Sequence, residues 1–238
     1  MSYALLRANL KNVRMLVMTL FFPVFMLFTF WISTRWDDPS EFDLMRYMYP
    51  AIVAISVMLT GQTLATRLNN WREQNIFQRL TLTSIDITTI MLGMAVTQII
   101  MGIIQGLAIL LIGVFLLEIN ISFLSFLLIL GVIIITGMTF IAYGTVIATL
   151  TRKSEMTGYA FFFSLLPLFF LASFPTEMLP PSIQVILPWL PTWMSIELIE
   201  SAIYAQVIPA NGVFMIIGLV IYIIIFGLIS GKFYNWED

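Results

Sequence analysis

Six long stretches without any Asp, Glu, Lys or Arg dominate the pattern of hydrophobic and polar positions along the chain. A bilayer core of about 30 Å is crossed by roughly 20 helical residues, which is the scale of each stretch. We therefore predict an all-α, polytopic membrane protein with six transmembrane helices. Their predicted ranges are Met15–Thr34, Tyr47–Thr66, Ile87–Leu117, Ile119–Thr151, Met156–Ser173 and Val213–Gly231.

A stretch rich in both proline and large apolar residues, 172–200, interrupts this pattern before the last predicted span. An interior proline removes a backbone hydrogen bond and clashes with the preceding turn, so a straight helix cannot carry this many. Irregular backbone is also not tolerated against lipid. We predict short broken helices that re-enter one face of the membrane over residues 172–206. The prolines concerned are Pro175, Pro180, Pro181, Pro188 and Pro191.

Basic residues gather on one side of the predicted spans. The segments on the side of the two termini hold nine Lys or Arg residues, whereas the opposite side holds only Arg35 and Arg46 among several carboxylates. The positive-inside rule then predicts a plasma-membrane protein, of bacterial type, with both termini in the cytoplasm and the proline-rich stretch outside. The nine are Arg7, Lys11, Arg14, Arg67, Arg72, Arg79, Arg152, Lys153 and Lys232.

The first fourteen residues carry Arg7, Lys11 and Arg14 at helical spacing beside an apolar stripe. This pattern predicts an amphipathic interface helix over residues 1–14, lying on the membrane surface. A secretory signal is the alternative, but the apolar run that follows is too long for one. The chain shows no internal repeat and no soluble domain, so we expect residues 1–238 to form a single membrane domain.

The amino-acid composition limits which catalytic, metal and ion-coupling sites the chain can form. The chain is 60% hydrophobic and 10% charged, with no Cys and no His, and its mean hydropathy is +0.99. Without these residues or paired intramembrane carboxylates we predict no catalytic residues and no metal site, so the chain is not expected to be an enzyme. The absence of charges from the spans also argues against proton-coupled or ion-coupled transport.

The energy for transport must then come from another chain. Gly231-Lys232 is the only Gly-Lys pair, and it is followed by Phe233 without the upstream glycine of a phosphate-binding loop. If ATP hydrolysis with Mg²⁺ supplies the energy, a partner subunit binds both. The segment 67–86 is the largest loop between spans on the basic side, and it predicts a short amphipathic helix that docks into a partner. A solvated loop with an interfacial helix is the alternative.

Two motifs together resemble one family. Arg72-Glu73, followed by Arg79-Leu80, matches the R-E-x-G-T-x-x-R-L-x-x-x-P pattern found before the third span of ABC-2 type transporter permeases, with Asn75-Ile76 in place of Gly-Thr and Ser84 in place of Pro. The proline-rich stretch resembles the outer signature of the same family, although the signature glycine is missing. The elements of that second match are Phe174, Pro175, Pro180 and Pro191.

The resemblance implies partners and roles. Such permeases pair as homodimers or heterodimers and bind two cytoplasmic ABC ATPase subunits, which hold ATP and Mg²⁺; membrane lipid is the other partner, and nucleic acid is not expected. The N-terminal helix and the 67–86 coupling loop would touch the ATPase, and the residues of the outer signature would form the outer gate. The coupling residues are then Arg72, Glu73, Phe77, Arg79 and Leu80, with Phe77 and Leu80 as the buried anchor.

Residues for a substrate path come from three places. Gln98 and Gln105 share one face of the third span beside a G-x-x-x-G formed by Gly102 and Gly106. Close helix packing with glutamine as an interhelical hydrogen-bonding group is the alternative to a cavity there. An aromatic face on the first span and polar groups on the second complete the set, with lipid-facing packing and interhelical hydrogen bonds as their alternatives. The predicted path is Phe21, Phe25, Phe28, Gln62, Thr66, Gln98 and Gln105.

The expected function is that of a permease subunit of an ATP-driven exporter for a hydrophobic or amphipathic compound, such as a drug, antibiotic, lipid or peptide. Permeases for polysaccharide or sodium export in the same family are the nearest alternatives. A different class of protein also stays open, namely an ATP-independent membrane protein such as a scramblase or a structural subunit.

Overall fold

The computed structural model describes residues 13–36, 44–81 and 87–233, and every regular element in these ranges is a helix. The six predicted spans are all present as helices, and their ends lie within a few residues of those expected from the charges, except that the second helix continues beyond the predicted Thr66 to Glu73. The predicted interface helix, residues 1–14, falls almost wholly outside the described residues. The long helices are α2 (Val13–Trp36), α3 (Leu44–Glu73), α5 (Ile87–Leu117), α6 (Phe123–Leu150), α7 (Ser154–Ser173) and α10 (Gly212–Phe233).

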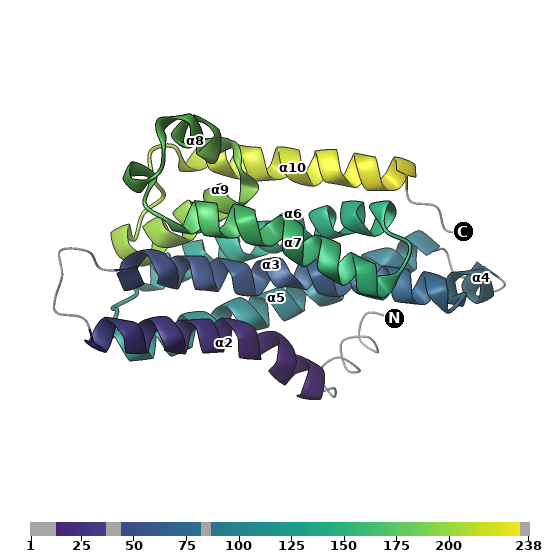
Figure 1. Ribbon diagram of the computed structural model, residues 1–238, viewed down its shortest axis with the longest axis horizontal. Helices are drawn as coiled ribbons and strands as arrows, with labels where there is room; N and C mark the ends of the chain where they lie inside the picture. Colours follow the sequence, from purple (N-terminus) through teal and green to yellow (C-terminus); the bar gives the residue numbers. More distant parts are fainter. Residues whose placement is uncertain (1–12, 37–43, 82–86, 234–238) are drawn as a thin grey trace.

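Five of these helices, α3, α5, α6, α7 and α10, are long and apolar enough to cross a membrane. The sixth, α2, has a shorter apolar part in the described region, Leu20–Thr34. The helices run roughly side by side along the long axis of the molecule (Figure 1). An all-α polytopic membrane protein is therefore confirmed.

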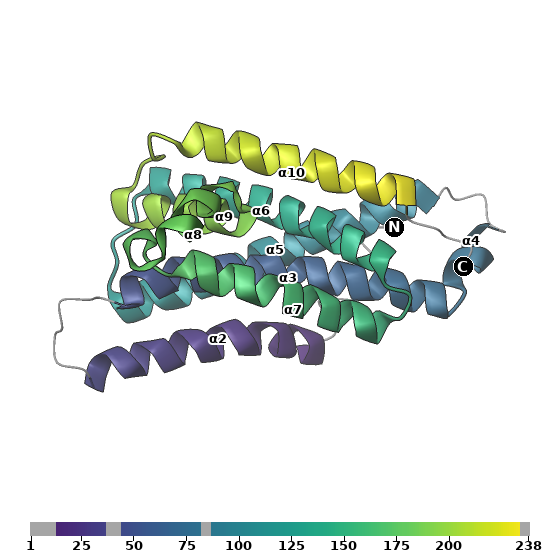
Figure 2. The ribbon, with the colours of Figure 1, turned by 45° about the horizontal axis from the view of Figure 1, so that its top comes forward.

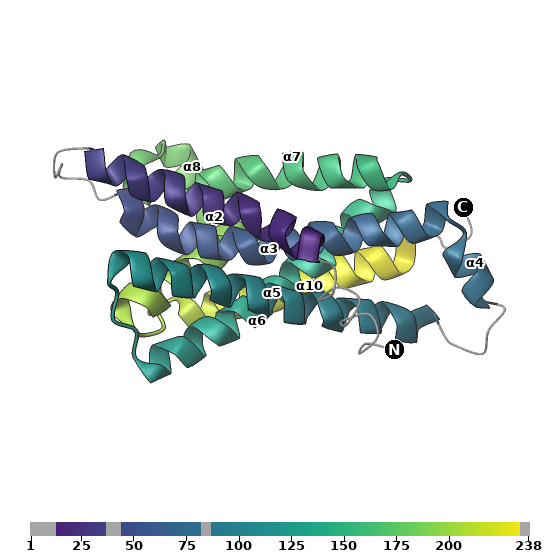
Figure 3. The ribbon, with the colours of Figure 1, turned by 90° about the horizontal axis from the view of Figure 1, so that it is seen from below.

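Helix α3 is the centre of the bundle, because α2, α5, α6, α7 and α9 all contact it. Figure 3 shows α2 crossing over α3 on one side, and Figure 2 shows α10 on the outside of α6. The most apolar window of α3 is 83% buried, whereas that of α10 is 17% buried. The small and β-branched residues between Ala51 and Val57 let neighbours approach α3 closely on every side.

The closest approach joins α3 to α6 through two glycines. A Cβ atom built on Gly61 would lie 2.0 Å from the carbonyl oxygen of Phe140, and one built on Gly144 would lie 2.3 Å from the carbonyl oxygen of Gly61. No side chain fits at either distance, so the two helices touch main chain to main chain. This crossing fixes the spacing of α3 and α6 near the middle of the bundle.

The two ends of the bundle differ. At one end, named here the α4 end, α3 finishes beside the short helix α4 (Ile76–Thr81) and close to the start of α7 (Figure 1). At the other, the α8 end, the chain between α7 and α10 is folded into a compact group of short elements. These are η1 (Thr176–Met178), α8 (Pro181–Ile186), η2 (Leu187–Trp189), α9 (Pro191–Glu200) and the π-turn η3 (Ser201–Ala205).

Prolines define the short elements of the α8 end. Pro181 and Pro191 are the first residues of α8 and α9, and Pro188 lies in the first turn of η2. At a helix start the missing N–H is one that has no intrahelical partner, so proline there costs nothing and fixes the backbone angle. The prediction of broken helices between the fifth and sixth spans is therefore confirmed.

Candidate functional site

The predicted coupling loop, 67–86, begins as helix. Hydropathy ends the second span at Thr66, but α3 continues to Glu73 before the chain turns into α4. Leu64, Leu68 and Arg72 are buried at helical spacing, so one face of this extension packs against the bundle. The α3 extension, the turn and α4 together are named here the elbow, residues 67–81.

Asn75 makes the turn of the elbow possible. Its φ angle of 53° lies in the left-handed region, and its N–H donates to the carbonyl oxygen of Arg72 at 2.9 Å. Glycine adopts this conformation without strain, and asparagine is the side chain that tolerates it best. Asn75 stands where the family pattern has glycine, so the departure preserves the backbone geometry.

This geometry predicts the result of two substitutions at one position. Asn75→Gly is expected to leave thermal stability within about 0.5 kcal/mol of wild type, whereas Asn75→Val is expected to cost about 1–2 kcal/mol, since a β-branched residue is strained at positive φ. Thermal unfolding of the purified variants in detergent measures both. Equal stability of the two variants would contradict the assigned turn.

Arg79 closes the same turn from the α4 side. Its Nη2 donates to the carbonyl oxygen of Gln74 at 2.6 Å, and its Nε donates to that of Asn75 at 3.4 Å. The side chain is exposed otherwise. Arg79 therefore adds side-chain hydrogen bonds to two carbonyls of the turn, one of which, that of Asn75, also accepts from the Arg79 N–H, while its guanidinium stays at the surface of the elbow.

Arg72 points the opposite way, into the protein. Its side chain is 9% exposed, and its Nη2 donates to the carbonyl oxygens of Thr151 at 2.7 Å and Ala148 at 3.3 Å, and to Oδ1 of Asn69 at 2.9 Å. Those carbonyls belong to the C-terminal turn of α6, where the helix dipole favours a cation. Arg72 thus ties the elbow to the end of α6.

Asn69 completes this buried network. Its Nδ2 donates to the carbonyl oxygen of Thr151 at 2.9 Å and to the hydroxyl of Thr157 at 2.6 Å, and the side chain is fully buried. Thr157 lies in the first turn of α7, so one amide on α3 bonds to both sides of the α6–α7 turn. Asn69 could not be predicted from the sequence, because a single asparagine at the end of a span fits a surface position equally well.

Glu73 ties the elbow to α7. Its carboxylate accepts from the backbone N–H of Ser154 at 2.9 Å and from the Ser154 hydroxyl at 3.1 Å. Ser154 is the first residue of α7, whose initial N–H groups lack helical partners and favour negative charge. Glu73 is therefore an exposed carboxylate that caps α7 from outside its own helix.

Phe77 lies in the core of its own chain. The ring is 1% exposed and lies 5.9 Å from the Trp71 ring, centroid to centroid. It packs in a cluster with Leu64, Leu68 and residues of α5 and α6. Phe77 therefore anchors α4 to the bundle in this conformation. Leu80 belongs to α4, but its side chain falls outside the described part of the chain.

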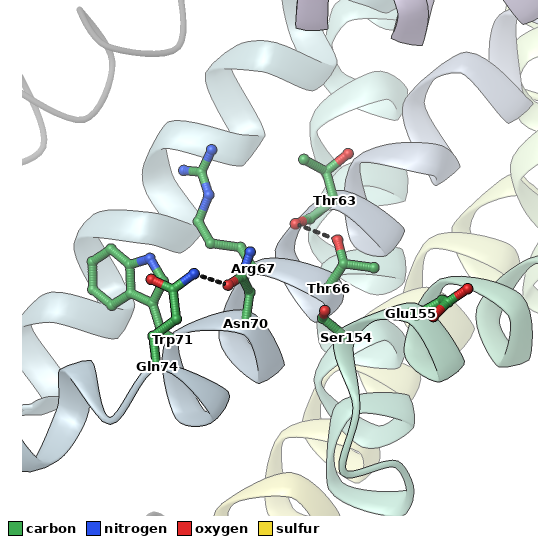
Figure 4. Close-up of a pocket in the computed structure, with 8 residues that line it drawn as sticks. All are labelled: Thr63, Thr66, Arg67, Asn70, Trp71, Gln74, Ser154 and Glu155. Carbon is green, nitrogen blue, oxygen red and sulfur yellow. Dashed lines mark hydrogen bonds between the residues drawn. The ribbon is translucent and has the colours of Figure 1, made fainter.

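A polar cavity of about 500 Å³ lies beside the elbow (Figure 4). One wall is the face of α3 that points away from the buried network, and the other is the start of α7. Thr66, from the predicted substrate path, lines it, and Gln62 lies one turn earlier and donates from Nε2 to the carbonyl oxygen of Gly158 at 3.0 Å. The lining is Thr63, Thr66, Arg67, Asn70, Trp71, Gln74, Ser154 and Glu155.

The other predicted path residues lie elsewhere. Gln98 and Gln105 are 2% and 5% exposed inside the bundle, and Gln98 Nε2 has no hydrogen-bond partner among the described residues. Gly102 and Gly106 face Val57 of α3, so this G-x-x-x-G packs helices within one chain. The aromatic face of α2 is exposed on the outside of the bundle. The structure therefore divides the predicted path into three separate groups, the last being Phe21, Phe25 and Phe28.

The sequence profile of the ABC-2 family transporter proteins matches residues 38–229. The chain belongs to this family. The ABC-2 protein is thus the membrane component of an ABC transporter, a role that implies a separate ABC ATPase subunit as its partner. Comparison with curated proteins found no match.

At the α8 end of the ABC-2 protein, two of the four predicted gate residues line a second cavity, of about 290 Å³. Phe174 and Pro175 line it directly, whereas Pro180 and Pro191 start or precede the short helices next to it. Two carboxylates of α9, Glu197 and Glu200, also line it. The cavity therefore combines aromatic and acidic groups beside the short elements of the α8 end.

The acid groups of this cavity predict a pH dependence. Burial, with the Glu197 carboxylate adding to it and Arg46 opposing it, raises the pKa of Glu200 from 4.5 to about 7. A raised carboxyl pKa means that the folded state holds the proton more tightly, so stability falls as pH rises from about 4.5 to about 7. Glu200→Gln of the ABC-2 protein is expected to raise the melting temperature at pH 8 and to leave it almost unchanged at pH 4.5.

Thermal melts across this pH range measure the effect, with Thr176→Val as a control because Thr176 lines the same cavity and does not titrate. A Glu200→Gln gain of the same size at pH 4.5 and pH 8 would contradict a titrating carboxyl at this position.

Proposed function

We propose that this ABC-2 protein is the permease subunit of an ATP-driven exporter that moves a hydrophobic or amphipathic compound out of the cell. The observation that carries the proposal is the elbow, which presents Glu73 and Arg79 at the surface while its hydrogen bonds hold it to α6 and α7. A partner that pushes on this elbow moves two other helices with it. The α4 end is then cytoplasmic, and the α8 end faces outward.

The coupling would run through the contacts already described. Glu73 and Arg79 would meet the ATPase, which binds ATP and Mg²⁺, and Arg72 and Phe77 would transmit the motion inward from their buried positions. Because α7 begins at the Glu73 contact and ends next to Phe174, a tilt of α7 reaches the outer gate directly. ATP binding would thereby shift the population between inward-open and outward-open states.

The pairing of two permease copies and the substrate path belong to the same proposal. The exposed phenylalanines of α2 offer an apolar surface for a bulky substrate or for a second copy, and Gln62 and Thr66 adjoin the cavity beside the elbow. Gln98 has an amide nitrogen that no described residue satisfies, which supports a rearrangement that opens the α5 face during transport.

The test is assembly with an ABC ATPase. The chain is expressed with the ATPase subunit encoded beside it, and the complex is purified in detergent. The double variant Glu73→Ala/Arg79→Ala is expected to bind the ATPase about tenfold more weakly and to lose the stimulation of ATP hydrolysis, because both exposed charges of the elbow are gone. Lys232→Ala is the control, a charge at the same end on another helix.

The outcomes separate the alternatives. Full transport by the double variant would overturn the assignment of the elbow as the coupling element. A chain that purifies without any ATPase, and that moves lipid across liposomes without ATP, would overturn the exporter and identify a scramblase.

A further inference from the structure

We propose that the cavity beside the elbow binds the headgroup of an aminophospholipid, with the phosphate toward Arg67 and the primary ammonium toward Glu155. The cavity has about 500 Å³ of space, within the usual size of ligand pockets. Thr66 of the proposed substrate path lines this cavity, but lipid retention is measured on the ABC-2 protein alone, so the failure of this inference and the failure of the exporter function are distinguishable.

The position of the cavity along α3 places it at the membrane surface. The 30 residues of α3 extend over about 45 Å, which matches the bilayer with both headgroup layers rather than its hydrocarbon core alone. Apart from Ser154 and Glu155, the lining runs from Thr63 to Gln74, over the last third of α3 and the first residue after it. Trp71, half-buried among these residues, is the residue type that favours the interface. The cavity therefore lies at the depth where lipid phosphates and amines are found.

The charges of the lining select a zwitterion. Among the described lining residues there is one cation, Arg67, and one carboxylate, Glu155, and they come from the two different walls of the cavity. Figure 4 shows the two side chains on opposite sides of the group. A purely anionic headgroup would meet repulsion from Glu155, and a purely cationic one would meet it from Arg67. A phosphate joined to an ammonium satisfies both.

The hydroxyl groups favour a primary ammonium over a quaternary one. Thr66 donates its hydroxyl hydrogen to the carbonyl oxygen of Gln62 at 2.9 Å, and Ser154 donates its own to Glu73 at 3.1 Å. Their oxygens are then left as acceptors toward the cavity. An ethanolamine ammonium has three N–H donors for these acceptors, whereas a choline group has none.

The amide groups serve the phosphate side. Gln74 donates from Nε2 to Oδ1 of Asn70 at 2.5 Å, which orients the Asn70 side chain with its Nδ2 as the remaining donor (Figure 4). Arg67 lies on the same helix one turn earlier. Arginine and amide side chains are both donors that bind phosphodiester oxygens, and Arg67 and Asn70 line the same cavity.

The experiment counts bound lipid. The full-length protein is purified, exchanged into detergent with an equimolar mixture of phosphatidylethanolamine, phosphatidylglycerol and phosphatidylcholine, and examined by native mass spectrometry. We expect phosphatidylethanolamine to be retained roughly three- to fivefold over each of the others, the range that exposed charge pairs provide. Glu155→Gln is expected to remove this preference in favour of phosphatidylglycerol, and Arg67→Gln to lower the retention of all three lipids.

Arg152→Gln is the matched control, because Arg152 is an exposed arginine at the same end of the bundle and does not line the cavity, and it should leave the lipid ratio unchanged. Equal retention of the three lipids by wild type, or an unchanged ratio in Glu155→Gln, would overturn the proposal. Displacement of the lipid by micromolar glycerophosphoethanolamine would identify a soluble ligand instead and would overturn the lipid assignment as well.

Discussion

Replacing Gly61 with alanine is expected to abolish most of the folded protein. The added Cβ would lie 2.0 Å from the Phe140 carbonyl oxygen, which belongs to the backbone of α6 and cannot turn aside as a side chain can. An overpacked core usually lowers the free energy of unfolding by about 1–3 kcal/mol, and a clash with main chain is expected to lower it by about 3 kcal/mol or more. Since α3 contacts six other described elements, its displacement from α6 affects the whole bundle. Fluorescence-detected size exclusion of a tagged protein measures the loss.

Gly144→Ala should show the same defect, because the two glycines make one contact. Gly131→Ala is the matched control on α6, where an added Cβ meets nothing within 4 Å and alanine is the better helix former. A monodisperse Gly61→Ala protein with wild-type yield and melting temperature would show that α3 and α6 do not cross at this point.

Arg72→Met is expected to destabilise the protein by about 3 kcal/mol. The variant keeps much of the side-chain length but leaves the carbonyl of Thr151 and Oδ1 of Asn69 without their charged donor in a buried position. Breaking a buried charged network by removing one partner costs several kcal/mol, more than a neutral hydrogen bond does. Thermal unfolding of the purified variant measures the loss.

Arg79→Met provides the comparison, since Arg79 is an exposed arginine of the same elbow and its loss should cost less than about 1 kcal/mol. A double-mutant cycle with Asn69→Leu should show strong coupling to Arg72, because the two side chains bond to each other and to the same carbonyl. Equal losses in Arg72→Met and Arg79→Met would contradict a buried structural role for Arg72.

The spans and the broken helices were predictable from the sequence because each depends on a local rule. Charged residues mark where helices leave the apolar core, and prolines mark where helices begin. The end of α3 was predicted wrongly at Thr66, since beyond the membrane a helix no longer needs apolar residues and hydropathy loses its information. Leu64, Leu68 and Arg72 are spaced four residues apart and are all buried, and this helical spacing identifies the extension.

The candidate site was harder to predict, since burial there depends on segments far apart in the chain. Arg72 and Glu73 are neighbours in one motif, yet one enters the core and the other caps a helix 81 residues away. From the motif alone, both side chains are predicted to be exposed charges that contact the ATPase. Likewise, the predicted path combined an aromatic face with polar residues of two other spans, and the packing of the helices placed Gln98 inside the bundle and Phe25 on its outer surface.

The crossing of Gly61 and Gly144 also determines how α3 and α6 are able to move. Two helices whose main chains touch at one point have no room to approach, and sliding would drive neighbouring side chains into the gap; rotation about the contact is the motion with the lowest cost. The crossing lies between the elbow and the short elements of the α8 end. We therefore expect that a displacement of one end of α3 moves its other end in the opposite direction, with the glycine contact as the pivot.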